Sequence, residues 1–212
     1  MDVDTDFRRI IGVREGLQQY YELEKKLDRV YLNSGRVLKK VGMNDKIWTK
    51  DENDNLSFVV VDSKPHLSEG GCIYLSKRSK YIYLITTNKN HPAFKLKTKY
   101  TNIRILYYNE VIDFNDAFRK LGSDYGIKRM TVQTGGDLNS VLIRKRLIDE
   151  VLIVIAPCLI GGKNTQSLIG GESLHNSCDL SNIGVLKLKD IKKLNSSYLV
   201  LNYEVLKETG LV

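Results

Sequence analysis

Two consecutive glycines, Gly135 and Gly136, mark the point in the sequence where the residue types most clearly suggest chemistry. The run from Lys128 to Thr134 is typical of a buried strand, and a helical pattern follows from Asp137 to Leu147. Glycine has no side chain to keep a ligand from the backbone, and the N–H groups at a helix start favour a phosphate. The junction therefore predicts an anion site. Since the spacing is neither G-x-G-x-x-G nor G-x-x-x-x-G-K-[ST], an ordinary tight turn remains the alternative.

Small polar residues follow three further runs that are typical of strands. These residues are Asn33-Ser34-Gly35, Asp62-Ser63 and Thr86-Thr87. In a parallel sheet the carboxyl ends of the strands meet at one edge, and ligands bind in the crevice outside them. We therefore expect Ser34, Gly35, Ser63 and Thr86 to form one polar rim together with the paired glycines. The alternative is that these residues only make turns and caps, which is their common role after strands.

The elements that must position these residues alternate between helix and strand. Apolar residues at helical spacing predict a helix from Val13 to Leu27, and Asp113 predicts the start of another that ends at Leu121. Nearly continuous apolar runs predict strands covered on both faces. The predicted strands are Arg29 to Leu32, Leu56 to Asp62, Tyr81 to Thr87, Ile103 to Tyr108, Lys128 to Thr134 and Glu150 to Pro157. The polar segment from Val37 to Asn55 is predicted to be a long loop with at most one helical turn.

The last part of the chain has a different pattern. Val185 to Leu194 and Tyr198 to Leu206 alternate apolar and polar residues, which predicts an antiparallel hairpin with one solvated face. An uncovered edge or apolar face there also favours a homodimer. The pairs Gly161-Gly162 and Gly170-Gly171 predict a long loop after a central strand that ends at Pro157.

Together these elements predict an α/β fold in three layers. A mostly parallel mixed sheet is flanked by helices and closed by the antiparallel C-terminal hairpin. Neither a linker nor an internal repeat divides the sequence. Residues 1–212 are therefore predicted to form a single domain.

The composition excludes several classes of protein. The 212 residues carry 33 Lys and Arg against 25 Asp and Glu, a net charge of +8. No apolar run approaches the roughly 18 residues of a membrane span, and the acidic start does not resemble a secretory signal, so a cytoplasmic location is expected. The three cysteines lack disulfide or zinc spacing, and His66, His91 and His175 are scattered, so no metal site is predicted. The positive charge occurs in short runs without a nucleic-acid motif, which favours a phosphorylated small molecule over nucleic acid as the partner.

The stretch from Met130 to Gly162 carries a resemblance to a known family. Its sequence, MTVQTGGDLNSVLIRKRLIDEVLIVIAPCLIGG, is similar to the reductase domain of riboflavin biosynthesis, a family with the dihydrofolate-reductase-like fold. Asp28 to Leu38 and Val59 to Ser63 resemble other parts of the same family. The likeness covers roughly residues 8 to 206 and is most specific between Leu147 and Gly162.

The resemblance implies hydride transfer from NADPH, or NADH, to a ribosylamino-pyrimidine 5′-phosphate. Ser63 would contact the adenosine end of the dinucleotide, and Ser34 and Gly35 would lie near its nicotinamide half. The nicotinamide supplies the hydride, so such a site needs no conspicuous pair of catalytic side chains. The residues that would hold the phosphates of the dinucleotide are Gly135, Gly136, Asp137 and Leu138.

Three candidate substrate-binding residues stand where the sequence departs from the family's pattern. Gln133 replaces the usual Glu at the end of a strand, Arg36 replaces a Thr, and Lys40 lies in a basic stretch that replaces an acidic one. Glutamine keeps hydrogen-bonding capacity but cannot act as a carboxylate base. No segment before Val13 resembles the family's first strand, and the signature of the zinc deaminase often fused to it is not found. A second interpretation therefore stays open, in which the chain is a non-catalytic nucleotide-binding member of the same fold.

Overall fold

The computed structural model describes residues 3–50, 53–165 and 167–210. They form two compact units. The parallel-sheet unit comprises residues 28–139, and the antiparallel-sheet unit combines residues 1–27 with residues 140–212. Each unit has its own sheet, and each is described by itself. The single-domain organisation stays a prediction.

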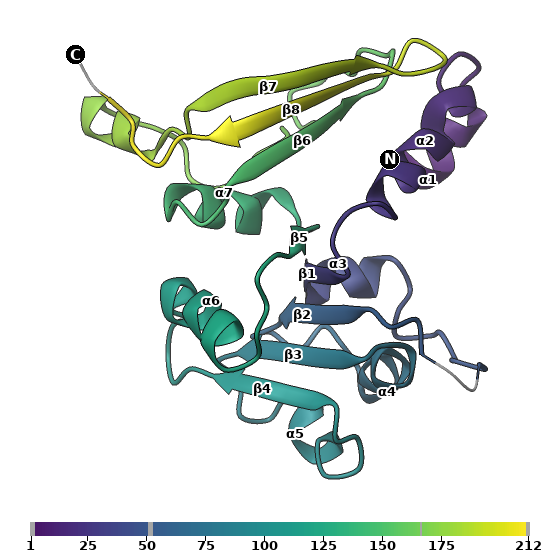
Figure 1. Cartoon of the computed structure of the whole chain (residues 1–212), viewed down its shortest axis with the longest axis vertical. Coiled ribbons are helices and arrows are strands. Elements are labelled where there is room, and N and C mark those ends of the chain that lie inside the picture. The colour runs from purple at the N-terminus through teal and green to yellow at the C-terminus, as the bar shows by residue number, and fades with distance from the viewer. Residues whose placement is uncertain (1–2, 51–52, 166, 211–212) are drawn as a thin grey trace. The chain divides into compact units, whose positions relative to one another are not determined.

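The parallel-sheet unit is built on five strands in the order β4-β3-β2-β1-β5, all parallel (Figure 1). The central strands are apolar along their length because both faces are covered, and Val59, Val60 and Ile85 have no exposed surface. Since the strands run the same way, their carboxyl ends lie at one edge of the sheet. The strands are β1 (Val30–Ser34), β2 (Ser57–Val61), β3 (Tyr81–Thr86), β4 (Ile103–Tyr107) and β5 (Thr131–Val132).

Helices pack on both faces of this sheet. Leu75 of α4 (Glu69–Arg78) and Leu96 of α5 (Ala93–Leu96) belong to the same buried cluster as Leu84 of β3. Neighbouring residues of a strand point to opposite faces, so Tyr83 lies on the other side. Its ring is 4.9 Å from that of Tyr125, which follows α6 (Phe114–Ser123). The prediction that Asp113 caps α6 is confirmed, because its Oδ1 accepts the N–H groups of the second and third helical residues at 3.0 and 3.1 Å.

Three helices of this unit, α3 (Gly35–Lys40), α4 and α5, were not predicted. The segment expected to be a loop begins with α3, because Ser34 caps it by accepting the Val37 N–H at 3.2 Å. Residues 51 and 52 of that segment lie outside the described residues. Helix α4 was missed because Gly70 and Gly71 have low helix propensity. Gly71 is required there, since a Cβ would lie 2.4 Å from the Asn44 side-chain oxygen.

The antiparallel-sheet unit contains three strands in the order β6-β8-β7, as Figure 1 shows. They are β6 (Glu150–Ile155), β7 (Leu186–Lys193) and β8 (Leu199–Val205). The predicted C-terminal hairpin is thereby confirmed, as is the α/β class with a parallel sheet. The expectation that the strand ending near Pro157 is central is wrong, because β6 pairs with β8 alone and stands at an edge. The remaining elements of this unit are α1 (Val3–Asp6), η1 (Phe7–Arg9), α2 (Arg14–Glu24), η2 (Ser177–Asn182) and part of α7 (Gly136–Arg144), which begins in the other unit.

Tyr198 connects the two ends of the chain within this unit. Its ring is 2% exposed, and its hydroxyl donates a hydrogen bond of 2.7 Å to the Val13 carbonyl just before α2. A Cβ on Gly16 would lie 2.3 Å from the same ring, so the helix can approach the tyrosine only with glycine at this position. Burial raises the pKa of the Tyr198 hydroxyl, which stays protonated and able to donate.

Candidate functional site

The predicted polar residues meet at the carboxyl edge of the parallel sheet. Ser34 ends β1, Ser63 follows β2, Thr86 ends β3, and Gln133 follows β5. Since β1 lies between β2 and β5, the segment around Ser63 and the paired glycines flank Ser34 on its two sides. We call residues 34–35, 62–63, 86–87 and 133–136 the rim. The prediction that these strand ends share one edge is confirmed, and their contacts with a ligand stay predictions.

Asp62 is the most highly connected side chain of the rim. Its residue is 2% exposed, and its carboxylate accepts the backbone N–H groups of His66 and Leu67 at 3.0 and 2.9 Å. The ring of His66 lies 3.0 Å from Oδ1 and the ring of His91 lies 3.2 Å from Oδ2. One buried carboxylate therefore ties the segment after β2 to the segment after β3.

These contacts decide the charge of Asp62. Burial acts to raise the pKa of its carboxyl, but the hydrogen bonds from His91, from the Leu67 N–H and from His66 outweigh burial. The pKa therefore lies below its ordinary value, and the group is a carboxylate at neutral pH. A buried anion of this kind is stable only while its hydrogen-bond donors stay in place.

Gly35 brings the start of α3 onto the same carboxylate. A Cβ at this position would lie 2.2 Å from the Asp62 Cγ and within 2.5 Å of both carboxylate oxygens. The backbone of Gly35 thus packs directly against Asp62, and no other residue type leaves room for this contact. The sequence predicted Gly35 as part of the rim, but the reason for a glycine at this position appears only in the structure.

Thr86 and Ser63 connect the next pair of loops. The Thr86 hydroxyl donates to the Asp62 carbonyl at 2.8 Å and accepts the Asn88 N–H at 3.1 Å. The Ser63 hydroxyl accepts the Thr87 N–H at 3.1 Å. Thr86 has no exposed surface, so it shapes the rim from within, whereas Ser63 is half-buried and open to a ligand.

The paired glycines form the other side of the rim. The Gln133 N–H donates to the Leu32 carbonyl at 2.8 Å, which carries the pairing of β5 with β1 up to the turn. The Thr134 hydroxyl donates to the Asn139 side chain at 2.6 Å, and this bond braces the turn against the first part of α7. Gly135 is exposed, and the nearest atom to a Cβ there would be 4.0 Å away.

The conformation of this turn changes the predicted role of its glycines. Gly135 and Gly136 are not among the glycines with a positive φ, so the turn does not need the left-handed backbone that glycine allows. The prediction that remains for them is access to the backbone, since α7 begins at Gly136 and the N–H groups of its first turn have no partner within the helix. Asp137 is exposed and Leu138 is half-buried beside them.

The three substrate candidates come from two neighbouring strands. Arg36 and Lys40 are exposed and lie four residues apart on α3, so they share one face of that helix. Gln133 is half-buried and follows β5, the strand next to β1. The structure thus places two cations and one amide around the β1 end of the rim.

Sequence reasoning missed His66 and His91. They are 25 positions apart in a chain where the histidines looked scattered, yet both contact Asp62. A signal was available, because each follows a predicted rim strand by four or five residues. In the described ranges, no group of three or more His, Cys, Asp and Glu residues is arranged to hold a metal ion.

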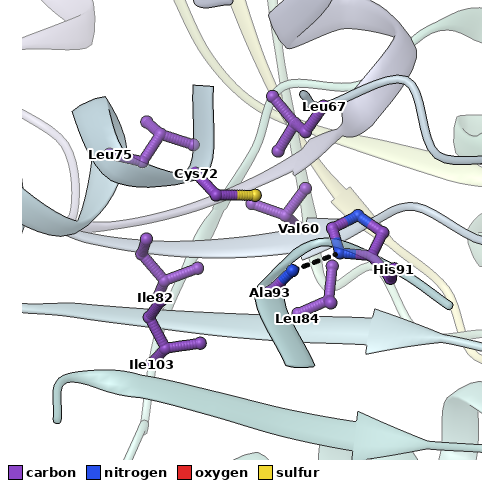
Figure 2. Close-up of a pocket in the computed structure, with 9 residues that line it drawn as sticks. All are labelled: Val60, Leu67, Cys72, Leu75, Ile82, Leu84, His91, Ala93 and Ile103. Atoms are coloured by element: carbon purple, nitrogen blue, oxygen red, sulfur yellow. Dashed lines mark hydrogen bonds between the residues drawn. The ribbon is translucent and has the colours of Figure 1, made fainter. Parts of the chain in front are cut away.

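A small apolar pocket lies between α4, α5 and the sheet next to His91 (Figure 2). The side chain of Cys72 projects into it, as Figure 2 shows. Burial, with the nearby charges of Asp62 and Glu69, raises the pKa of the Cys72 thiol to about 12. Cys72 is therefore a protonated core residue and not a nucleophile. No helix in the described part of the chain is long and apolar enough to cross a membrane.

Curated relatives of the chain are reductases. One relative is the 2,5-diamino-6-ribosylamino-4(3H)-pyrimidinone 5′-phosphate reductase of Archaeoglobus fulgidus, to which the chain is 25% identical over 181 residues. The aligned region covers 82% of this chain and 81% of the relative. The chain is 30% identical over 108 residues to the Aquifex aeolicus protein of the same name, covering 50% of this chain and 46% of the relative. For the Aquifex protein the match thus spans less than half of the relative's length.

Solved structures share the fold. RibD of Acinetobacter baumannii matches 91% of the chain with a TM-score of 0.65 at 14% identity, and the chain spans about half of that protein, 51%. A deaminase/reductase of Thermotoga maritima matches 90% of the chain with a TM-score of 0.59 at 14% identity. The model of one family, the RibD C-terminal domain, matches residues 15–200. Since this match spans most of the sequence and agrees with the fold, the chain belongs to the RibD C-terminal domain family.

Proposed function

We propose that the chain is an NADPH- or NADH-dependent reductase that transfers a hydride to a ribosylamino-pyrimidine 5′-phosphate. The observation that carries this proposal is the rim, where the bare Gly135-Gly136 turn at the start of α7 lies on the same sheet edge as Ser34 and Ser63. The relatives, which are named as reductases of such a pyrimidine phosphate, support the same activity. The substrate is a small phosphorylated molecule, not nucleic acid.

The chain's own residues bind and orient the reactants in this proposal. A Cβ at Gly135 would meet only Val37, at 4.0 Å, so the backbone there is open to a diphosphate, which accepts the N–H groups at the start of α7. Ser63 contacts the adenosine end, and Ser34 and Gly35 border the nicotinamide half. Arg36 and Lys40 attract the substrate phosphate, and Gln133 donates or accepts a hydrogen bond to its ring. The nicotinamide supplies the hydride, so the protein's contribution is position and orientation.

A non-catalytic nucleotide-binding role is the second candidate. It is favoured by Gln133, which offers no carboxylate for acid or base work. Titration with NADPH and NADH, followed by turnover measurements on a panel of pyrimidine phosphates, separates the two candidates. Binding with turnover supports the reductase, and binding without turnover supports the second candidate. No binding of either dinucleotide at millimolar concentration contradicts both.

Replacing Gly136 by valine is expected to weaken NADPH binding more than tenfold, roughly 1.4 kcal/mol. A branched side chain at the first residue of α7 covers the N–H groups that we assign to the diphosphate. The dissociation constant is measured by calorimetry. The matched control is Gly161→Val, at a glycine whose Cβ would meet nothing within 4 Å and that lies outside the rim. Equal NADPH affinity in Gly136→Val and the parent would contradict the proposal that this turn binds the diphosphate.

We further propose that the chain forms a homodimer through the antiparallel sheet. Paired residues of an antiparallel ladder share a face, so Leu201 of β8 lies between Ile153 and Ile191 on one side of the sheet. Ile191 and Leu188 on that side are 55% and 46% exposed. Light scattering is expected to give a dimer for the parent and a monomer for Ile191→Asp. A monomeric parent at high concentration would contradict the proposal.

A cytoplasmic location stays a prediction.

A further inference from the structure

The hydrogen bonds of His91 determine its protonation. Its Nδ1 accepts the N–H of Ala93 at 3.2 Å, a bond visible in Figure 2, so this nitrogen carries no proton. The proton of the neutral ring is therefore on Nε2, which donates to the Asp62 carboxylate at 3.2 Å. His91 is 1% exposed, so both of its nitrogens are used inside the protein. A second proton on His91 would require the Ala93 bond to break.

His66 contacts the same carboxylate in a different way. Its Nδ1 lies 3.0 Å from Asp62 Oδ1, and because the carboxylate can only accept, this nitrogen carries the proton. The side chain is 33% exposed, whereas that of Asp62 is fully enclosed. Among the described residues none hydrogen-bonds the other nitrogen, Nε2. Asp62 therefore fixes the ring and leaves one titratable nitrogen of His66 available.

Two further titratable side chains lie near this pair, one in the segment after β3 and one on α4. His91 contacts Asp62 from the segment after β3, and Cys72 approaches from α4 with its thiol protonated. Glu69, at the start of α4, is the other acid whose charge acts on Cys72. Histidine is the side chain that ordinarily gains or loses its charge between pH 5 and 8, and His66 is the histidine of this cluster with a nitrogen that no described residue hydrogen-bonds.

His66 also lies beside the predicted adenosine subsite. It follows Ser63 by three residues in the segment between β2 and α4, which Ser63 connects to Thr87. The His66 carbonyl accepts a hydrogen bond of 2.9 Å from the Asn44 side chain, so the backbone that carries the ring is fixed from a second segment. The ring is thus held against Asp62, which is a residue of the rim.

We propose that Asp62 and His66 form a proton-gated anion-binding pair, in which Nε2 of His66 takes up a proton and donates it as a hydrogen bond to a phosphate oxygen at the adenosine end of the dinucleotide. Asp62 stabilises the resulting imidazolium and holds its direction. Hydrogen bonds between charged partners are the strong ones, and histidine gains or loses its charge between pH 5 and 8. The inference rests on the proposed dinucleotide site and adds a ligand contact that depends on pH.

The test measures the affinity of the full chain for NADP⁺ at pH 6 and pH 8 by calorimetry. His66→Gln can still donate to Asp62 but carries no charge at either pH. We expect the ratio of parent affinity to His66→Gln affinity to fall roughly tenfold from pH 6 to pH 8. The phosphate of the ligand also titrates, with a pKa near 6, but this affects both affinities equally and cancels in the ratio. His175→Gln is the matched control, because His175 is exposed and lies outside the rim. Its affinity is expected to follow that of the parent.

The possible outcomes distinguish the pair from the site on which it depends. If the ratio of parent affinity to His66→Gln affinity is the same at both pH values, the proposal of an anion-binding pair is wrong and the dinucleotide site stands. If NADP⁺ binds the parent at neither pH, the proposed function fails and the pair fails with it. If the His175→Gln control shows the same loss as His66→Gln, the effect does not come from the rim and the proposal is again overturned.

Discussion

Gly35→Ala is expected to lower the free energy of unfolding by about 3 kcal/mol or more, one of the largest effects available in this chain. The new Cβ would lie 2.2 Å from Asp62 Cγ, and that carboxylate cannot move freely because its oxygens hold the His66 and Leu67 N–H groups. Moving the carboxylate leaves these donors buried without a partner, at about 1–3 kcal/mol each. Urea denaturation followed by circular dichroism measures the change.

Gly135→Ala is the matched control for this prediction. Both glycines follow a strand of the same sheet, but a Cβ at Gly135 would meet only Val37, at 4.0 Å. This variant is expected to be as stable as the parent or slightly more stable, because alanine reduces the freedom of the unfolded chain. Equal denaturation midpoints for the Gly35 and Gly135 variants would show that the contact with Asp62 is not tight.

Asp62→Asn is expected to cost about 3–5 kcal/mol of stability at neutral pH, as does the removal of one member of a buried charged network. An amide offers one oxygen where the carboxylate offers two, and its NH2 group would face the donors of His66, Leu67 or His91. The buried donors that lose their acceptor account for the cost. The measurement is urea denaturation of the parent and the variant between pH 3 and pH 8.

The pH dependence has a definite sign. The pKa of Asp62 is lower in the folded protein than its ordinary value of 3.8, so its stabilising effect is present above that value. The effect is lost as the pH falls through the folded-state pKa. The difference in the free energy of unfolding between the parent and Asp62→Asn should therefore be largest near pH 7 and smaller in acid. Asp190→Asn, at a carboxyl group that is 50% exposed, is the control and should stay within about 0.5 kcal/mol of the parent at every pH. If the stability difference between the parent and Asp62→Asn does not change with pH, Asp62 is not the buried carboxylate with a lowered pKa that we assign.

The strands of the parallel sheet were predictable because their residues are apolar without interruption. Runs such as Phe58 to Val61 and Ile82 to Ile85 suit strands buried on both faces, and few other structures accommodate them. The ends of β5 were not predictable, since only Thr131 and Val132 pair although the strand-like pattern is longer. Helix α4 was missed because its glycines serve a contact with Asn44 that lies far away in sequence.

The candidate site was predictable where it depends on the direction of the strands alone. Parallel strands bring Ser34, Ser63 and Thr86 to one edge whatever their order. The group of Asp62, His66 and His91 depends in addition on β3 being the neighbour of β2, and no local pattern in the sequence specifies that order. The same holds for Gly35, whose contact with Asp62 requires β1 on the other side of β2.

The bond between Tyr198 and Val13 also sets an order of events during synthesis. The two residues are 185 positions apart, so at 5–20 residues per second Val13 is added to the chain roughly 10 to 40 seconds before Tyr198. The parallel-sheet unit needs no residue after Asn139 and is complete well before then. During this interval the apolar residues of the α2 segment lack the partner against which Leu17 packs in the folded protein.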